Sequence, residues 1–125
     1  MSARTLESMQ RIDLPTIRAA WWAFTSLHLT RRRLRTRPVA DVAVRRPPPL
    51  PAHAGRGVDA VLRRASSTCL ERALVLQRWL SDHGTSKDVV VGVTSPKDFR
   101  AHAWLDGEAV DEQFHELVRL KPPPG

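Results

Sequence analysis

The chain has very little cysteine: its 125 residues contain one, Cys69. A single cysteine excludes an intramolecular disulfide, so the thiol is free, buried or reactive. We expect such a chain in a reducing cytoplasm. A domain of this length can bury a sufficient core without disulfides or metals, so we expect one domain with short appendages.

Long apolar runs are also absent. The most apolar stretch, "AAWWAFTSLHL", contains polar residues and falls short of the about 20 residues that span a bilayer. The N-terminal "MSARTLESMQRIDL" has no basic stretch leading into an apolar run, as a secretory signal would. We therefore expect no transmembrane segment and no secretory signal.

The sequence contains no glycine-rich phosphate loop, so a nucleotide site is not expected. Nor do the histidines show a metal-ligand spacing with the lone cysteine. Apart from His102 they are His28, His53, His83 and His115. We therefore expect no cofactor and no metal.

Acidic residues are scarce in the first half of the chain. Residues 1–65 hold 13 Lys/Arg and 4 Asp/Glu, a net charge of +9, while residues 66–125 hold 7 and 9, a net charge of −2. The formal net charge of +7 is thus unevenly placed. This asymmetry predicts a docking surface in the first half and chemistry in the second.

The first half is expected to be helical. An apolar stripe at three- and four-residue steps predicts an amphipathic helix over residues 14–30. This helix either packs on the core of the domain or binds a partner or a membrane surface. The arginines of "TRRRLRTRP" then form a solvated helix end, or hold an acidic peptide, a nucleic acid or lipid headgroups. The stripe consists of Leu14, Ile17, Trp21, Phe24 and Leu27 or His28.

Proline marks the boundary between the two halves. "RRPPPLPAHAGRG", residues 45–57, favours polyproline II, and we interpret it as a linker rather than a proline-rich recognition motif. A short helix is expected over residues 58–65. The predicted organisation is a basic helical docking region (1–44), the linker (45–57), a catalytic core (58–120) and a disordered tail (121–125).

The cysteine lies at the predicted start of a helix. "TCLE" fits a capping box in which Thr68 is the N-cap and Glu71 is the third helical residue, and Gly84 is a plausible stop. Cys69 then takes the first helical position, where free backbone N–H groups and the macrodipole favour a thiolate. The same N–H groups suit an oxyanion. The alternative is an inert, buried thiol.

A hairpin is expected to follow. "DVVVGVT" (88–94), "FRAHAWL" (99–105) and "EAVD" (108–111) suggest three strands, and Asp106-Gly107 favours a type I′ turn between the last two. In that register His102 lies opposite Asp111. A carboxylate beside an imidazole can orient it for catalysis, although the pair can also be polar contacts without chemistry. Asp106, within the turn, is the weaker candidate.

The motifs "CLERALVLQRWLSDHG", "VVVGV" and "FRAHAWLDGEAV" resemble the cysteine-protease domain of lasso-peptide biosynthesis, in the transglutaminase-like, papain-like group. The resemblance covers about residues 56–115. It implies that Cys69 is the nucleophile, His102 the base and Asp111 the orienting carboxylate. Ser66 and Ser67 are the only nearby candidates for a side-chain oxyanion donor.

The same resemblance implies a fold and an activity. The fold would be α+β and papain-like, with N-terminal helices and a small antiparallel sheet packed on the cysteine-bearing helix. The enzyme would remove the leader peptide from a ribosomal precursor before a separate ATP-dependent cyclase closes the macrolactam. The first half looks too short and too helical to include a PqqD-like leader-recognition domain, so that protein is expected as a separate partner.

Two other functions fit the residues. The chain could be a basic nucleic-acid-binding module with an inert cysteine, or an acyltransferase that uses an amine in place of water. If the chain is a peptidase, its basic half is expected to dock the leader or its recognition protein. The residues proposed for that contact are Trp21, Trp22, Phe24, Arg31, Arg32, Arg33 and Arg35.

Overall fold

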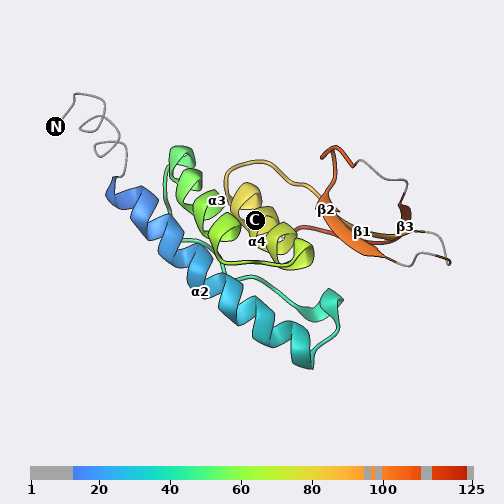
Figure 1. The fold of residues 1–125 in the computed structure, drawn as a ribbon. Coiled ribbons are helices and arrows are strands. Elements are labelled where there is room, and N and C mark those ends of the chain that lie inside the picture. Colours follow the sequence, from blue (N-terminus) through green and yellow to red (C-terminus); the bar gives the residue numbers. More distant parts are fainter. Residues whose placement is uncertain (1–12, 95–96, 98–99, 111–113, 124–125) are drawn as a thin grey trace.

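A helical layer packs beside a small antiparallel sheet (Figure 1). The computed structural model describes residues 13–94, 97, 100–110 and 114–123. The helices are α2 (Leu14–Thr36), α3 (Gly55–Arg64) and α4 (Cys69–Asp82), and the strands are β1 (Val89–Val93), β2 (Ala101–Leu105) and β3 (His115–Leu120). Two short 3-10 helices, Val39–Asp41 and Ala52–Ala54, lie between α2 and α3. The expected α+β fold, with the sheet on the cysteine-bearing helix, is confirmed.

Helix α4 is the central element because it contributes to two cores. One face packs with α2 and α3, where Val75 and Trp79 are buried against Trp22 and Leu27. The other face packs on the sheet, where Ala73 and Leu74 meet Val89, Ala103 and Leu105. Burial of these apolar surfaces is the main force that fixes the helix carrying Cys69 against the strands.

The inner face of α2 differs from the predicted stripe. Trp22, Ala23 and Leu27 are buried, whereas Leu14, Ile17, Trp21 and Phe24 are exposed. The Trp22 ring packs at a tilt against Trp79, and its indole N–H donates to the Arg45 carbonyl at 3.1 Å. Gly57 of α3 allows this helix to lie close to α2, because a Cβ at Gly57 would lie 2.2 Å from the Thr16 carbonyl oxygen. Of the two alternatives for the predicted stripe, packing on the core therefore holds for Leu27 alone.

The second helix begins before its predicted start. It spans Gly55–Arg64 rather than residues 58–65, so its first turn lies in the segment interpreted as a linker. The proline segment before it runs beside α2, and Pro47 is buried. At the other end of the chain, Lys121 pairs with Asp88 at 3.0 Å, and the Pro123 carbonyl lies 3.5 Å from the Ser81 hydroxyl. The start of the expected disordered tail thus has fixed contacts.

The sheet has the order β2-β1-β3, with both pairs antiparallel. The predicted hairpin between residues 99–105 and 108–111 is therefore wrong: residues 108–110 form no strand, and among the described residues β2 pairs with β1 alone. Gly107 has a φ of 96° while Asp106 does not have a positive φ, which is the pattern of a type II turn rather than type I′. The third strand begins later, at His115, and pairs with the other side of β1.

Candidate active site

The start of α4 places Cys69. Thr68 is the N-cap, its hydroxyl accepts the backbone N–H of Glu71 at 3.2 Å, and the Glu71 carboxylate accepts the Thr68 N–H at 3.0 Å. The predicted capping box is confirmed, and Cys69 is the first helical residue, with a free, partly exposed thiol. Gly84, with a φ of 85°, lies just beyond the helix end as expected.

The capping carboxylate also ties α4 to α2. Arg31 donates to both Glu71 oxygens, at 3.0 and 3.1 Å. Burial would by itself raise the pKa of Glu71, but the hydrogen bonds from Arg31 and Thr68 and the Arg31 charge outweigh it and hold the pKa below its ordinary value of 4.5. The same pairing raises the pKa of Arg31. Sequence reasoning missed this bridge because 40 residues separate its partners.

The thiol lies at an open edge of the sheet. The backbone N–H of Ala103 donates to Cys69 Sγ at 3.4 Å. Ala103 lies opposite Val91 of β1. Because its backbone N–H binds the sulfur and not β1, this N–H points away from β1. Among the described residues no strand pairs with that side of β2, which we call the free edge of β2. The sulfur therefore occupies a hydrogen-bonding position that a neighbouring strand would otherwise fill.

His102 is the neighbour of that N–H in the chain, but its ring lies on the other face of the sheet. Side chains alternate along a strand, and Ala103 and Leu105 face α4. The His102 ring instead stacks with Trp104 (centroids 5.7 Å apart) and packs at a tilt against Phe114 (5.3 Å). No hydrogen bond joins the thiol and the imidazole in the part of the chain that the structure describes. The two residues lie on adjacent elements, α4 and β2.

A glycine in β1 makes room for these rings. A Cβ at Gly92 would lie 2.8 Å from Trp104 Cη2 and 3.1 Å from Phe114 Cβ. Gly92 is also the residue that pairs with His102 across the strands. Sequence analysis did not single out Gly92 or Phe114. A glycine within a run of valines was the available signal, because it often marks a close approach in a sheet.

The carboxylates near the turn have other partners. Asp111 lies outside the described residues, so its place in the site stays a prediction. Asp106 follows the last residue of β2, and its carboxylate accepts a hydrogen bond from Arg119 at 3.0 Å. Glu108 accepts the Leu105 N–H at 2.9 Å, and Arg72 at 3.2 Å, and these contacts outweigh its burial and lower its pKa. Glu108 thus caps one further position on the free edge of β2.

The two serines before the helix differ in what they offer. The Ser67 hydroxyl donates to the Leu62 carbonyl at 2.8 Å, so its proton is engaged. Ser66 has a φ of 51°, a left-handed conformation that non-glycine residues seldom adopt. That conformation turns the chain between α3 and α4. Backbone N–H groups in the first turn of α4 are further donors at this end of the helix.

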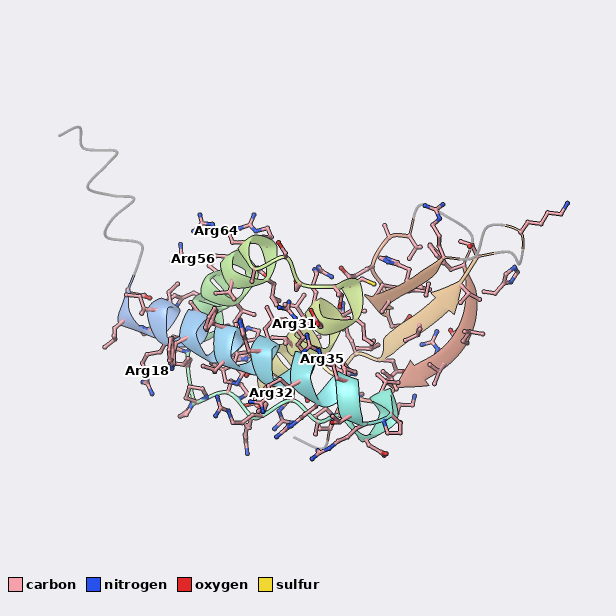
Figure 2. The ribbon with its side chains drawn as sticks, turned by 60° about the horizontal axis from the view of Figure 1, so that its bottom comes forward. Arg18, Arg31, Arg32, Arg35, Arg56 and Arg64 are labelled. Carbon is pink, nitrogen blue, oxygen red and sulfur yellow. The ribbon has the colours of Figure 1, made fainter. Side chains whose placement is uncertain are left out.

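The residues expected to dock a partner fall into two groups. Trp22 is in the core, Arg31 binds Glu71, and Arg33 donates to the Ala43 carbonyl at 2.6 Å. Trp21 and Phe24 are exposed, as are Arg32 and Arg35. Figure 2 shows Arg18, Arg32 and Arg35 along α2, with Arg56 and Arg64 over α3.

The described ranges contain neither a cluster of metal-ligating side chains nor a membrane-spanning helix. No three His, Cys, Asp or Glu side chains gather there as metal ligands would. No helix there is long and apolar enough to cross a membrane.

Comparison with known proteins identifies a family. The model of the transglutaminase-like superfamily matches residues 14–122, a range that contains helices α2, α3 and α4 and strands β1, β2 and β3. No curated protein and no solved structure gives a significant match. Domains of this superfamily commonly serve as scaffolds of cysteine proteases and acyltransferases. With its cysteine at the mouth of a capped helix, beside a strand that carries a histidine, the chain belongs to the transglutaminase-like superfamily.

Proposed function

We propose that the protein is a cysteine peptidase that removes the leader peptide from a ribosomally made lasso-peptide precursor, in the cytoplasm. The observation that carries this proposal is the position of Cys69 Sγ, at the first residue of α4 and on the free edge of β2. A nucleophile there is open to a substrate, and the helix N-terminus favours its anionic form. The motifs shared with the lasso-peptide proteases give the substrate class.

In the first step the Cys69 thiol transfers its proton to His102 and attacks the scissile carbonyl. Backbone N–H groups at the start of α4 receive the developing oxyanion. His102 then protonates the leaving amine as the C–N bond breaks, which releases the core peptide and leaves the leader as a thioester. Water, deprotonated by His102, hydrolyses the thioester, and the thiol is restored. Asp111 is the proposed orienting carboxylate.

The mechanism requires the imidazole at the free edge of β2. In the structure its ring stacks with Trp104 and packs at a tilt against Phe114. Rotation of the His102 side chain out of this stack and toward the strand edge is therefore part of the proposal. A near-attack arrangement formed only with substrate is common at such sites.

The partners are a precursor peptide, a separate PqqD-like recognition protein that holds the leader, and the cyclase that acts next. An acyltransferase on the same scaffold would form the same thioester but release it to an amine. Mass spectrometry separates the two reactions, because hydrolysis leaves a free acid on the leader and transfer leaves an amide.

The test is cleavage of the precursor in the presence of its recognition protein, with the precursor taken from the genes beside this one. Cys69→Ala is expected to abolish cleavage and to leave the circular dichroism spectrum unchanged, because alanine suits the first turn of a helix. His102→Ala should lower kcat/KM by about 10²–10⁴. Asp111→Asn should cause a milder but clear loss.

Asp106→Asn is the matched control, since this carboxylate pairs with Arg119 and has no proposed chemical role. Wild-type cleavage by Cys69→Ala would contradict the mechanism. If Asp106→Asn is inactive and Asp111→Asn is active, the carboxylate has been assigned to the wrong residue.

A further inference from the structure

Helix α2 presents a second apolar face to solvent. Trp21 and Leu14 are each 67% exposed, Ile17 is 54% exposed and Phe24 is 43% exposed. The Trp21 and Phe24 rings stack with their centroids 6.0 Å apart. We call this pair the aromatic ridge. Contiguous exposed apolar groups of this kind are uncommon on a monomer and mark a surface that binds something.

A hollow lies on each side of the aromatic ridge. One, of about 630 Å³, lies between α2 and the proline segment and is lined by Ile17, Trp21, Pro47 and Pro48. The other, of about 350 Å³, lies between α2 and α3 and is lined by Phe24, Val61 and Ala65. A ridge between two apolar hollows offers the partner both an anchor and pockets for its own side chains.

The charges around these hollows have one sign. Arg18 and Arg45 line the first hollow and Arg64 lines the second. None of the three forms an ion pair within the part of the chain that the structure describes, and no described carboxylate lines either hollow. Arg32 and Arg35 extend the same side of α2 toward its C-terminus (Figure 2). This arrangement attracts an acidic surface and repels a second copy of the same face.

We propose that the aromatic ridge and its two hollows bind an acidic protein partner. The apolar side chains of the partner fill the hollows, and its carboxylates meet Arg18, Arg45 and Arg64. A protein fits better than a bilayer because a lipid surface is flat, whereas the side chains of a protein can enter two separate hollows. The inference concerns binding alone and does not depend on the proposed peptidase activity.

The test is selection of random 12-residue peptides displayed on phage against the full-length chain. The chain carries Cys69→Ala so that no bound peptide is hydrolysed. The selected peptides should be rich in Asp and Glu interspersed with Leu, Phe or Trp. Synthetic copies should bind at least about tenfold more weakly to Trp21→Ala, because a central aromatic anchor carries much of the binding free energy. They should bind more weakly to Arg18→Gln/Arg64→Gln at low salt, with less salt dependence.

Two variants serve as matched controls. Leu117→Ala removes an apolar side chain of equal exposure (66%) from β3, and Arg63→Gln removes an exposed charge from α3 next to Arg64. Both should bind the peptides like the parent chain. The proposal would be overturned if no acidic, apolar peptides are enriched, or if the enriched peptides bind Trp21→Ala as tightly as the parent chain.

Two other outcomes would replace the proposal. If the chain sediments with phosphatidylglycerol vesicles more tightly than it binds the selected peptides, and Trp21→Ala abolishes this, the surface binds lipid. If the chain forms a dimer in analytical ultracentrifugation that Trp21→Ala dissociates, the surface binds a second copy.

Discussion

Glu71 shows how one side chain can hold a reactive neighbour in place. It is 4% exposed, accepts the Thr68 N–H that would otherwise be unpaired, and binds Arg31 of α2 through both oxygens. Cys69 lies between Thr68 and Glu71 in the chain. The carboxylate therefore fixes the turn that presents the thiol, without being part of the chemistry.

We predict that Glu71→Gln lowers the free energy of unfolding at neutral pH by about 1–3 kcal/mol, because the partly buried contact with Arg31 loses the carboxylate charge. The difference between wild type and variant should depend on pH. A lowered folded-state pKa stabilises the protein above the ordinary carboxyl pKa of 4.5, and this stabilisation is lost as the pH falls below that value. Urea unfolding from pH 7 to pH 3 measures both curves.

The subtraction removes the contribution of the other carboxylates. The pKa values of Asp13, Asp88 and Glu108 are also lowered, so both proteins lose stability in acid, but these losses cancel in the difference. A difference that stays constant down to pH 3 would show that Glu71 has no charged contact in the folded state.

At the scale of the helix and strand, local signals were reliable and long-range pairing was not. The limits of α4 follow from Thr68, Glu71 and Gly84, which act within a few residues of each other. The predicted hairpin fails because the pairing of β2 is decided elsewhere: Arg119 binds Asp106, and the Glu108 carboxylate takes the Leu105 N–H that a third strand would need. No short-range pattern contains these contacts.

The buried face of α2 could not be chosen from sequence for a related reason, since apolar residues recur at helical spacing on both of its faces. The inner face of α2 carries the small residues Ala19, Ala23 and Ser26. Gly57 of α3 packs closely against the same helix. For the site, Cys69 could be placed from sequence because capping is local. The contact between the His102 ring and Phe114 could not be predicted from sequence, because it depends on the space that Gly92 leaves in strand β1.

Two adjacent tryptophans of α2 test the orientation of this helix. Trp22→Ala should lower the free energy of unfolding by about 3–5 kcal/mol, because it empties a core site against Trp79. Trp21→Ala should change it by less than about 1 kcal/mol, since this side chain is exposed. Chemical denaturation of the two variants gives both values. A larger loss for Trp21→Ala than for Trp22→Ala would mean that α2 packs through the stripe predicted from sequence.

At the scale of the whole molecule, ion pairs neutralise the charges near the sheet but leave several arginines of α2 without a carboxylate partner among the described residues. The carboxylates at the sheet end are neutralised nearby, because Asp88, Asp106 and Glu116 bind Arg119 or Lys121. Arg18, Arg32 and Arg35 of α2 have no ion pair among the residues described. The net charge of +7 therefore appears mainly on the helical layer, away from the free edge of β2.

We predict that cleavage of the precursor in the presence of the recognition protein slows as salt rises, because screening weakens attraction between exposed charges. A variant with Arg18, Arg32 and Arg35 all changed to Gln should be slower at low salt and nearly independent of salt. Arg63→Gln is the control. Strong, salt-dependent DNA binding that the triple variant loses, together with an unreactive thiol, would instead favour the nucleic-acid module.

The contact between Ala103 and Cys69 Sγ has a spectroscopic consequence. An anionic sulfur is a stronger acceptor than a thiol, so ionisation of Cys69 should move the Ala103 amide proton downfield. The ¹⁵N-labelled protein can therefore be titrated by nuclear magnetic resonance without any substrate. After alkylation of Cys69 with iodoacetamide, the chemical shift of the Ala103 amide proton should no longer change with pH. A backbone amide in the sheet thus serves as a built-in indicator for the charge on the nucleophile.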